Sequence, residues 1–280
     1  MYSLYRFFTN TKYKIKVIAT DFYKLKNNRD LQEVTFLIPV RIDHPDREKN
    51  INLSIDFLQH HFDTNIIVGE ESHYPQLQYL EKKVRYYHYQ TSSIYTHKTK
   101  ILNKLARLAE TPIIVIWDTD ALVEPSQILT ACQVIKEGKL DMVYPYGGIF
   151  TDLPRAFHED LIKQEYELSK LLSSMFQFHQ GDSVGGAVFF NREVFFKGGM
   201  MNENFVSYGW EDNELIERFC KLDYKIGRIK GALVHLQHYR GENSTEKNLF
   251  AINNQQELKK IKMMTKEELI AYVEECLKNR

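Results

Sequence analysis

The sequence predicts a single compact α/β domain built on a mostly parallel central sheet that is flanked by helices. From Val34 onward, short apolar runs alternate with helical segments, and the joins between them are short. A strand, a helix and a second strand joined in this way form a right-handed βαβ unit, and repeated units build a parallel sheet. Such sheets bind ligands beyond the carboxyl ends of their strands, so we expect the functional residues there.

The first half of the chain supplies most of the expected sheet. Its strands are short apolar or aromatic runs, and its helices are longer segments in which apolar and polar residues alternate with helical spacing. We expect strands at Val34–Val40, Asn65–Val68, Val84–His88 and Pro112–Trp117, and helices at Asp46–His61 and Lys98–Ala109.

The second half has a different pattern, with more helix and shorter strands. No repeat, low-complexity segment or linker rich in Pro, Gly and Ser separates it from the first half, which favours one domain. We expect helices at Ser126–Lys136, His158–Phe178, Glu211–Lys221 and Lys259–Lys278, and strands at Ala187–Phe190, Lys225–Ile229 and Leu233–Leu236.

Composition excludes several classes of protein. The chain has 280 residues, 43% hydrophobic and 26% charged, which excludes disorder and allows a full core. Lys and Arg number 37, as do Asp and Glu, so the net charge is zero and we expect no nucleic-acid partner. Cys132, Cys220 and Cys276 lie far apart without metal-finger spacing, which indicates a reducing compartment. No run suits a membrane helix or signal peptide, so we expect a cytoplasmic protein.

The first thirty residues carry the strongest local charge bias. Seven basic side chains stand against Asp21 and Asp30, and aromatic residues are interleaved with them. We favour a solvated extension that packs on the main domain. The alternative is a peripheral contact of residues 1–30 with the anionic inner face of the membrane, which basic and aromatic residues together would support.

Two acidic residues follow the apolar strand that ends at Trp117. Asp118 and Asp120 stand at its carboxyl end, where a parallel sheet places its ligand, and both can approach one hard divalent cation and the phosphate oxygens bound to it. The alternative is a polar turn that closes the strand, because a D-x-D pattern alone is weak evidence.

Two histidines follow the short apolar stretch that ends at Val234. Residues three apart face opposite ways on a regular strand, so His235 and His238 can reach one ion only if the chain turns between them. The alternative is a pair of ordinary hydrogen-bonded histidines at a strand end.

The segment from Tyr208 to Glu214 combines aromatic and acidic residues around Gly209. An aromatic pair followed by Glu211 and Asp212 resembles a platform for a sugar ring with a carboxylate beside it. The alternative is helix N-terminal chemistry, in which acidic residues of the first turn meet the positive end of the helix dipole. Both hold together if a first-turn carboxylate faces a cleft, where it is available as a general base.

Charged residues also follow the first expected strand. Arg41 and Asp43 could bind a diphosphate and a nucleoside, although lone charged residues in a loop are usually solvated. The chain has no G-x-G-x-x-G, no P-loop and no G-x-S-x-G pattern, which excludes the common dinucleotide, P-loop and hydrolase sites.

Taken in order, these segments resemble the metal-dependent inverting glycosyltransferases of the GT-A fold, and in particular the β-1,4-galactosyltransferases and their bacterial galactosyl- and N-acetylgalactosaminyltransferase relatives. The resemblance runs from about Val34 to Asn248. The segments that carry it are Ile38–Arg41 (family I-P-F-R), Lys100–Asn103 (K-L-L-N), Val115–Asp120 (strand and D-x-D), Gly185–Val188 (G-G-V-S), Tyr208–Glu214 (W-G-G-E-D-D-D) and His235–Arg240 (M-x-x-H-x-R).

The resemblance implies a Rossmann-like GT-A sheet and a role for each matching residue. It implies donor binding by Pro39, Arg41, Asp43, Glu71, Lys100, Asn103 and Asp118; acceptor binding by Tyr208, Gly209, Trp210 and Glu211; metal binding by Asp118, Asp120, His235 and His238; and catalysis by Asp212 as base. It also divides the chain into an N-terminal extension (1–32), a donor half (33–125), an acceptor and catalytic half (126–245) and a helical tail (246–280).

The expected activity is transfer of galactose or N-acetylgalactosamine from a UDP-sugar to a saccharide, free or lipid-linked, with Mn²⁺ or Mg²⁺ as cofactor, in bacterial surface polysaccharide synthesis. The chain departs from the family pattern at four positions: Val40 replaces an aromatic residue, Asp43 stands where a second arginine is common, Trp210 replaces glycine, and His235 replaces methionine. The rival functions are a retaining enzyme of the same fold, a non-catalytic sugar-binding protein and a nucleotidyltransferase using the same metal site.

Overall fold

The computed structural model describes residues 15–19, 29–179, 181–245 and 247–278. Residues 1–30, for which a membrane contact was one interpretation of the sequence, therefore lie largely outside the described residues. Within them, no helix combines the length and the apolar character that crossing a membrane would require.

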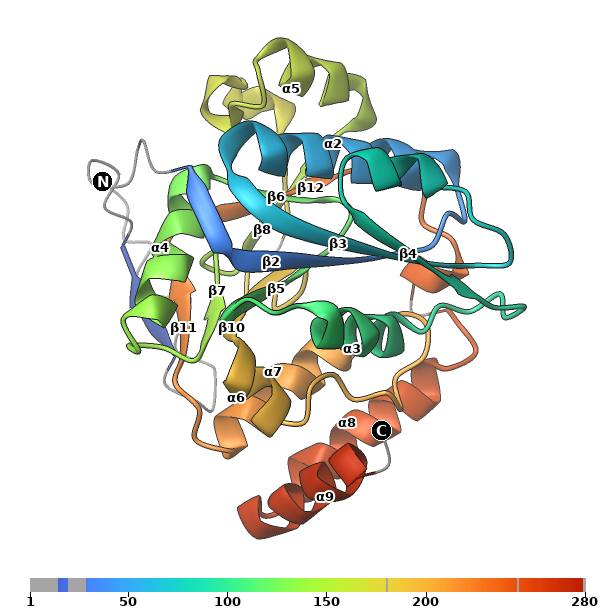
Figure 1. Ribbon diagram of the computed structural model, residues 1–280, viewed down its shortest axis with the longest axis vertical. Coiled ribbons are helices and arrows are strands. Elements are labelled where there is room, and N and C mark those ends of the chain that lie inside the picture. The colour runs from blue at the N-terminus through green and yellow to red at the C-terminus, as the bar shows by residue number, and fades with distance from the viewer. Residues whose placement is uncertain (1–14, 20–28, 180, 246, 279–280) are drawn as a thin grey trace.

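The described residues form a large mixed sheet in which seven strands run parallel and β10 runs against its neighbours (Figure 1). The prediction of a mostly parallel sheet is confirmed. In spatial order the strands are β1 (Lys16–Ile18), β11 (Ile226–Ile229), β7 (Met142–Tyr144), β10 (Ala187–Asn191), β5 (Ile113–Trp117), β2 (Asp30–Val40), β3 (Asp63–Ser72) and β4 (Arg85–Gln90).

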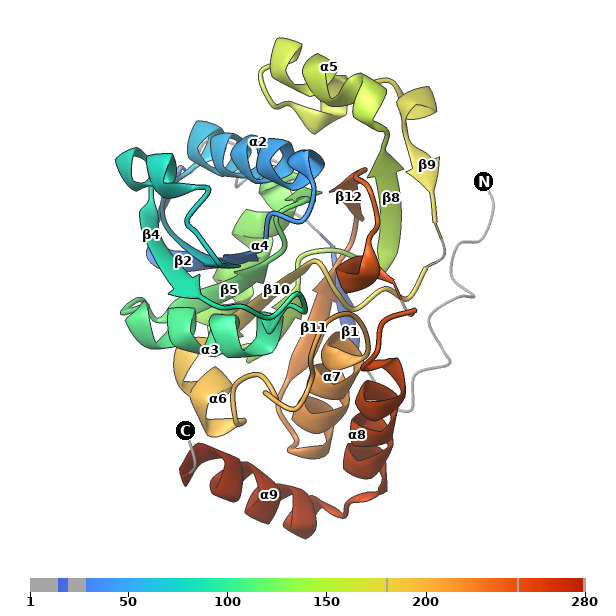
Figure 2. The same cartoon turned by 90° about the vertical axis from the view of Figure 1, so that its right-hand side faces the viewer.

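Helices cover both faces of this sheet (Figures 1 and 2). One face carries α2 (Pro45–His61) and α4 (Pro125–Lys136), and the other carries α3 (Lys98–Leu108), α6 (Arg192–Lys197) and α7 (Glu211–Lys221). The C-terminal α8 (Ala251–Met263) and α9 (Lys266–Lys278) form one end of the molecule, and α5 (His158–Lys163) lies at the opposite end.

The core of the large sheet is aromatic at its centre. Phe36, Trp117 and Phe189 come from the adjacent strands β2, β5 and β10, are fully buried, and pack edge to face with ring centroids 5.3 and 5.9 Å apart. The Trp117 indole N–H donates to Ser54 Oγ of α2 at 2.9 Å, so the one polar atom of the ring has a partner. Strand β5 is buried along its whole length, which fixes the position of the residues that follow it.

A second, smaller sheet adjoins the first at two places along the chain. Its strands, in spatial order, are β6 (Ala121–Val123), β12 (Ala232–Leu236), β8 (Ile149–Leu153) and β9 (Gln177–Phe178). The chain passes from β5 to β6 through Asp118–Asp120, and from β11 to β12 through residues 230–231. The predicted metal-binding segments therefore stand where the two sheets meet.

The prediction of one helix over His158–Phe178 is wrong. Helix α5 ends at Lys163, Glu165 and Tyr166 adopt left-handed conformations, and the chain continues as 3-10 turns at Leu168–Lys170 and Ser173–Met175. A continuous helix of this length would span roughly 30 Å and could not return to the sheet. The chain must return, because Gln177 of β9 pairs with Asp152 of β8.

The prediction of one C-terminal helix over Lys259–Lys278 is also wrong. Helix α8 begins earlier, at Ala251, and ends at Met263; α9 starts at Lys266. Thr265 and Glu268 form a reciprocal capping box: the Thr265 N–H donates to Glu268 Oε2 at 2.8 Å and the Glu268 N–H donates to Thr265 Oγ1 at 3.2 Å. The pattern T-x-x-E marked this helix start in the sequence and was overlooked.

Helix α7, which presents Glu211 and Asp212 at its start, is anchored by a buried ion pair. Arg218 Nε donates to Glu214 Oε1 at 2.6 Å, and both side chains are almost fully buried. The same guanidinium also donates to the carbonyl oxygens of Gly198 and Met200, so one side chain ties α7 to the turn after α6.

We expect Arg218→Ala to lower the free energy of unfolding by about 3–5 kcal/mol, because it leaves the charge of Glu214 buried without a partner. Urea unfolding measures this loss. The matched control is Lys197→Ala, which removes an exposed pair with Glu193 and should cost no more than about 0.5 kcal/mol. Equal losses in the two variants would contradict the anchoring role of Arg218.

Candidate active site

A cleft of about 620 Å³ opens beyond the carboxyl ends of β2 and β5, at the junction of the two sheets. Its volume falls in the range of small-molecule sites, about 300–1,000 Å³. The predicted site residues that line it are Pro39, Arg41, Asp43, Asp118, Asp120, Tyr208, Gly209, Trp210, Glu211, Asp212, His235 and His238.

Three of the four predicted metal ligands converge in this cleft. The side-chain ligand atoms of Asp120, His235 and His238 all lie within 4.8 Å of one another, and all three residues are buried. His238 Nε2 is 3.1 Å from Asp120 Oδ2, and His235 Nε2 is 3.7 Å from Asp120 Oδ1. One carboxylate and two imidazoles suit a divalent cation. Asp118 is not part of this group.

Strand register and the end of β12 bring the two histidines together. His235 pairs with Ala121 of β6 on one side and with Asp152 of β8 on the other. Strand β12 ends at Leu236, whose N–H donates to the Asp120 carbonyl oxygen at 2.8 Å, so His238 lies past the regular strand and is free to face the same carboxylate. The turn that the i, i+3 spacing demanded is therefore present.

Each histidine has its Nδ1 held and its Nε2 directed at Asp120. His235 Nδ1 lies 2.7 Å from Asp152 Oδ1, and His238 Nδ1 lies 2.6 Å from the Tyr239 carbonyl oxygen. Because both of these partners are acceptors, they favour a proton on Nδ1 and a free lone pair on Nε2. Metal-binding histidines are held in this way, by a carboxylate or a backbone carbonyl. The residues present therefore fit a metal ion.

The Asp120 carboxylate stays ionised in this setting. Its burial opposes ionisation, but His235, the hydrogen bond to His238 and the charge of Arg47 outweigh burial and hold its pKa well below the ordinary value. Arg47 Nη1 donates to Asp120 Oδ2 at 2.6 Å from the start of α2. Arg47 was not among the predicted site residues, yet it brings a second guanidinium to the cleft beside that of Arg41.

Arg41 presents a largely buried guanidinium with spare donors to the cleft. Its Nη1 donates to the Ser93 carbonyl oxygen at 2.6 Å, and its Nη2 lies 3.5 Å from Glu71 Oε2. Nε and Nη2 have no hydrogen-bond partner among the described residues. Buried N–H groups without partners are costly, so these donors are suited to an anionic or carbonyl-bearing ligand.

Three of the predicted donor-binding residues do not line the cleft. Glu71 is buried behind it, where it faces Arg41 and accepts a hydrogen bond from the His97 N–H at 2.7 Å. Lys100 is exposed on α3. Asn103 is buried and bonds both the N–H and the carbonyl oxygen of Met201, at 2.9 Å each, so it joins α3 to the turn after α6.

Lys98, which the sequence analysis did not select, links the two sides of the cleft. Its Nζ lies 2.8 Å from Asp118 Oδ1 and 3.6 Å from Glu211 Oε1. Burial alone would lower the pKa of Lys98, but Asp118, Asp212 and Glu211 outweigh burial and raise this pKa well above the ordinary value. Lys98 is therefore a fixed positive charge between the D-x-D turn and α7.

The segment that carries the aromatic residues Tyr208 and Trp210 has an unusual backbone. Ser207, Gly209 and Trp210 have φ values of 59°, 111° and 73°, in the left-handed region. Bulky residues rarely adopt this conformation, and the cost is about 1–3 kcal/mol. Trp210 thus adopts a conformation that glycine takes more readily, and its side chain contributes to the cleft wall.

Asp212 lies at the first turn of α7 and faces a glycine. A Cβ on Gly185 would stand 2.5 Å from Asp212 Oδ2, so a larger residue at this position would force the Asp212 carboxylate to move. Burial raises the pKa of Asp212 to about 8; Lys98 opposes this rise, and the negative charges of Glu211 and Asp118 add to it. A carboxyl group with a pKa near neutrality is suited to proton transfer.

Comparison with known proteins gives the class. A family model described as the N-terminal domain of galactosyltransferase matches residues 168–242, which include α7 and both metal-site histidines. No curated protein matches the chain.

Solved structures share its fold at low identity. They include the catalytic domain of Drosophila beta1,4galactosyltransferase 7 with xylobiose (16% identity, 85% of this chain and 82% of that chain, TM-score 0.53). Glucosyl-3-phosphoglycerate synthase from Mycobacterium tuberculosis with Mg²⁺ and UDP is similar over 87% of this chain and 86% of that chain, with 14% identity and a TM-score of 0.52. S. aureus TarS with UDP-GlcNAc is similar over 87% of this chain and 70% of that chain, with 14% identity and a TM-score of 0.57.

The fold is therefore the GT-A fold predicted from the sequence. Together with the family model, it identifies the chain as a glycosyltransferase.

We expect the carboxyl group of Asp212 to titrate near pH 8 in the free protein, because burial disfavours its charge. Lys98→Met should move this titration to higher pH, since it removes the cation that favours the ionised form. The carboxyl ¹³C chemical shifts of protein labelled at aspartate, followed against pH, measure the pKa of Asp212 in the wild type and in Lys98→Met. The signal that disappears in Asp212→Asn is assigned to Asp212. Titration of every aspartate near the ordinary value of about 3.9 would contradict the burial argument.

Proposed function

We propose that the protein is a metal-dependent inverting glycosyltransferase that moves a hexose, galactose or N-acetylgalactosamine, from a UDP-sugar to a saccharide hydroxyl. The observation that carries the proposal is one cleft with two chemically different carboxylate centres. Asp120 lies among histidines and Arg47, where negative charge is stabilised, whereas Asp212 lies where a proton is retained until about pH 8. When the pKa of one carboxyl group is lowered and that of another in the same cleft is raised, the two groups are suited to separate roles.

The donor end is suited to a nucleoside diphosphate. Arg41 offers unpartnered N–H groups, and Arg47 and Lys98 add positive charge around the D-x-D turn. A divalent cation held by Asp120, His235 and His238 would supply charge neutralisation for the leaving diphosphate. Support for a metal and for UDP comes from glucosyl-3-phosphoglycerate synthase, whose structures contain UDP with Mg²⁺ or Mn²⁺.

The acceptor end is suited to a sugar hydroxyl. Tyr208 and Trp210 offer aromatic faces in the cleft wall, and Glu211 and Asp212 follow them at the start of α7. Inversion needs a base on the side of the sugar opposite the leaving group, and Asp118 and Asp120 face the donor side. Asp212 is therefore the base, Glu211 binds the acceptor, and Lys98 holds Asp118 and Glu211 in place.

The choice of sugar and the cellular role rest on the resemblance. The family model for a galactosyltransferase domain supports a galactose-type donor. We propose a role in bacterial surface polysaccharide synthesis, with a free or lipid-linked saccharide as acceptor; a lipid-linked acceptor would be reached at the membrane face through residues 1–30.

One experiment tests the proposed function directly. The protein is incubated with Mn²⁺ and single UDP-sugars, with and without candidate saccharides, and free UDP is measured. We expect UDP release with UDP-galactose or UDP-N-acetylgalactosamine that increases with a suitable acceptor and stops in excess chelator. UDP-sugar binding without any release would indicate a sugar-binding protein. Pyrophosphate release from nucleoside triphosphate and sugar phosphate would indicate a nucleotidyltransferase.

We expect Asp212→Asn to lower kcat by about two orders of magnitude or more while leaving UDP affinity near that of the wild type, because it removes basicity and keeps size. In the wild type, kcat/KM should rise with pH through about 8, since only the deprotonated carboxylate accepts the acceptor proton. The variant should lose this rise. Near-normal turnover, or loss of UDP binding, would contradict this role for Asp212 and move the role of base to Glu211, the other first-turn carboxylate that lines the cleft.

We expect Asp152→Asn to weaken Mn²⁺ binding by about 10–100-fold, because Asp152 orients His235 without touching the ion site itself. Calorimetric titration with Mn²⁺ in the presence of UDP measures the affinity. Asp160→Asn, a change on the outer helix α5, is the matched control and should bind Mn²⁺ as the wild type does. Unchanged affinity in Asp152→Asn would show that the hydrogen bond to His235 does not prepare the site.

A further inference from the structure

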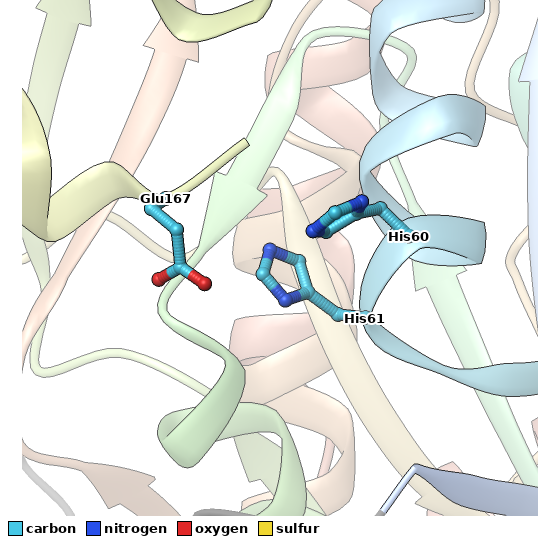
Figure 3. A group of neighbouring side chains, drawn as sticks. All are labelled: His60, His61 and Glu167. Atoms are coloured by element: carbon cyan, nitrogen blue, oxygen red, sulfur yellow. The ribbon is translucent and has the colours of Figure 1, made fainter. Parts of the chain in front are cut away.

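A second cluster of metal-binding side chains lies away from the cleft. His60 and His61 end α2, and Glu167 reaches them from the turn that follows α5; Figure 3 shows the carboxylate directed toward the two imidazoles. Helix α2 contributes Arg47 to the cleft near its start, and the rise per residue places His61 about 21 Å further along the helix. The cluster is therefore separate from the proposed catalytic metal site.

The Glu167 carboxylate has no other partner that explains its position. It precedes the 3-10 turn Leu168–Lys170 but does not cap it, and within the described part of the chain no Lys or Arg forms an ion pair with it. Burial and then the charge of Glu167 raise the pKa of Glu124, so a second carboxyl group lies close by. Arg29, on the histidine side, is already bound to the carbonyl oxygen of His60 at 2.6 Å.

The backbone around Glu167 holds one histidine in a metal-binding form. His61 Nε2 lies 3.1 Å from the Tyr166 carbonyl oxygen, which can only accept, so Nε2 carries the proton and the other ring nitrogen keeps its lone pair. A hydrogen bond from one ring nitrogen to a backbone carbonyl is the usual support of a metal-bound histidine. The His60 ring packs against Tyr166 and His61 with centroids 5.4 and 4.9 Å away, and part of it is exposed to solvent.

We propose that His60, His61 and Glu167 bind a zinc ion. Two imidazoles and one carboxylate are a common zinc ligand set, and a water completes the tetrahedron where His60 is exposed. The ligand atoms lie within 4.8 Å of one another. Bond lengths near 2.05 Å require separations of about 3.3 Å, and rotation of the unpaired Glu167 side chain can supply most of this closure.

The proposed ion joins the end of α2 to the segment between β8 and β9, beside the hydrogen bond of His61 to Tyr166. Glu167 belongs to the segment between β8 and β9, and β8 carries Asp152, which orients His235 in the cleft. Zinc at the end of α2 would hold this segment against the main sheet. We therefore assign the ion a structural role, which does not depend on the proposed transfer reaction.

The test counts zinc in the full chain by equilibrium dialysis and atomic absorption. The cleft can also take zinc, so Asp120→Asn is the reference background, and circular dichroism with an unfolding transition in excess chelator first establishes that this variant folds. In the folded variant we expect one bound zinc per chain. Adding Glu167→Gln or His60→Gln should remove that zinc. Because His60 is exposed and Glu167 is half-buried, a folding defect is not expected in either variant, and loss of zinc in both would not be due to misfolding of one. Adding His73→Gln, an exposed histidine outside both clusters, should change nothing.

A second readout follows the structural role. In the Asp120→Asn background, zinc should raise the thermal unfolding midpoint, and Glu167→Gln should abolish the rise. Retention of the zinc by both Glu167→Gln and His60→Gln, or no zinc bound in the Asp120→Asn reference, would overturn the proposal. Neither result depends on sugar transfer, so failure here and failure of the proposed function are distinguishable.

Discussion

The buried carboxylate of Asp120 is the interaction around which the site is organised. Its side chain is 8% exposed, and a charge so buried is costly unless it is paired and hydrogen-bonded. Arg47 of α2, His235 of β12 and His238 beyond β12 all contact this carboxylate. The most distant of them, His238, lies 118 positions from Asp120 in the sequence. Pairing this one charge therefore requires the helix, both sheets and the turn between them to be correctly assembled.

The acceptor side is held by other means. The left-handed backbone at Trp210 places strain beside the proposed base, and glycine at position 185 leaves room for the Asp212 carboxylate. Arg218, which pairs with Glu214 within α7, also donates to the carbonyl oxygens of Gly198 and Met200 and so joins α7 to the turn after α6. Lys98 then connects the two sides, because it faces Asp118 on one and Glu211 on the other. The cleft residues are thus positioned by strand ends, by the first turn of α7 and by buried charges.

Much of the fold could be predicted from local pattern. The buried strands β2 and β5 and the helices α2, α3, α4 and α7 follow from apolar runs and helical spacing, and the structure confirms them within a few residues. The strands β6 and β7 were missed, because three residues give no periodicity, and β8 was missed because Thr151 and Asp152 interrupt its apolar run. The false helix over 158–178 had helical spacing, but pairing of β9 with β8 overrides it.

The candidate site divides in the same way. Asp118, Asp120, Asp212 and the two histidines belong to short motifs at the ends of predicted elements, and the structure brings them to one cleft. Arg47, Lys98 and Asp152 could not be predicted from the sequence, because each acquires its role from a partner between 20 and 113 positions away.

The most direct test of the proposed metal site is anomalous diffraction from crystals grown with Mn²⁺ and UDP. We predict one manganese peak within about 2.2 Å of ligand atoms of Asp120, His235 and His238; a peak bound by Asp118 without either histidine would contradict the account.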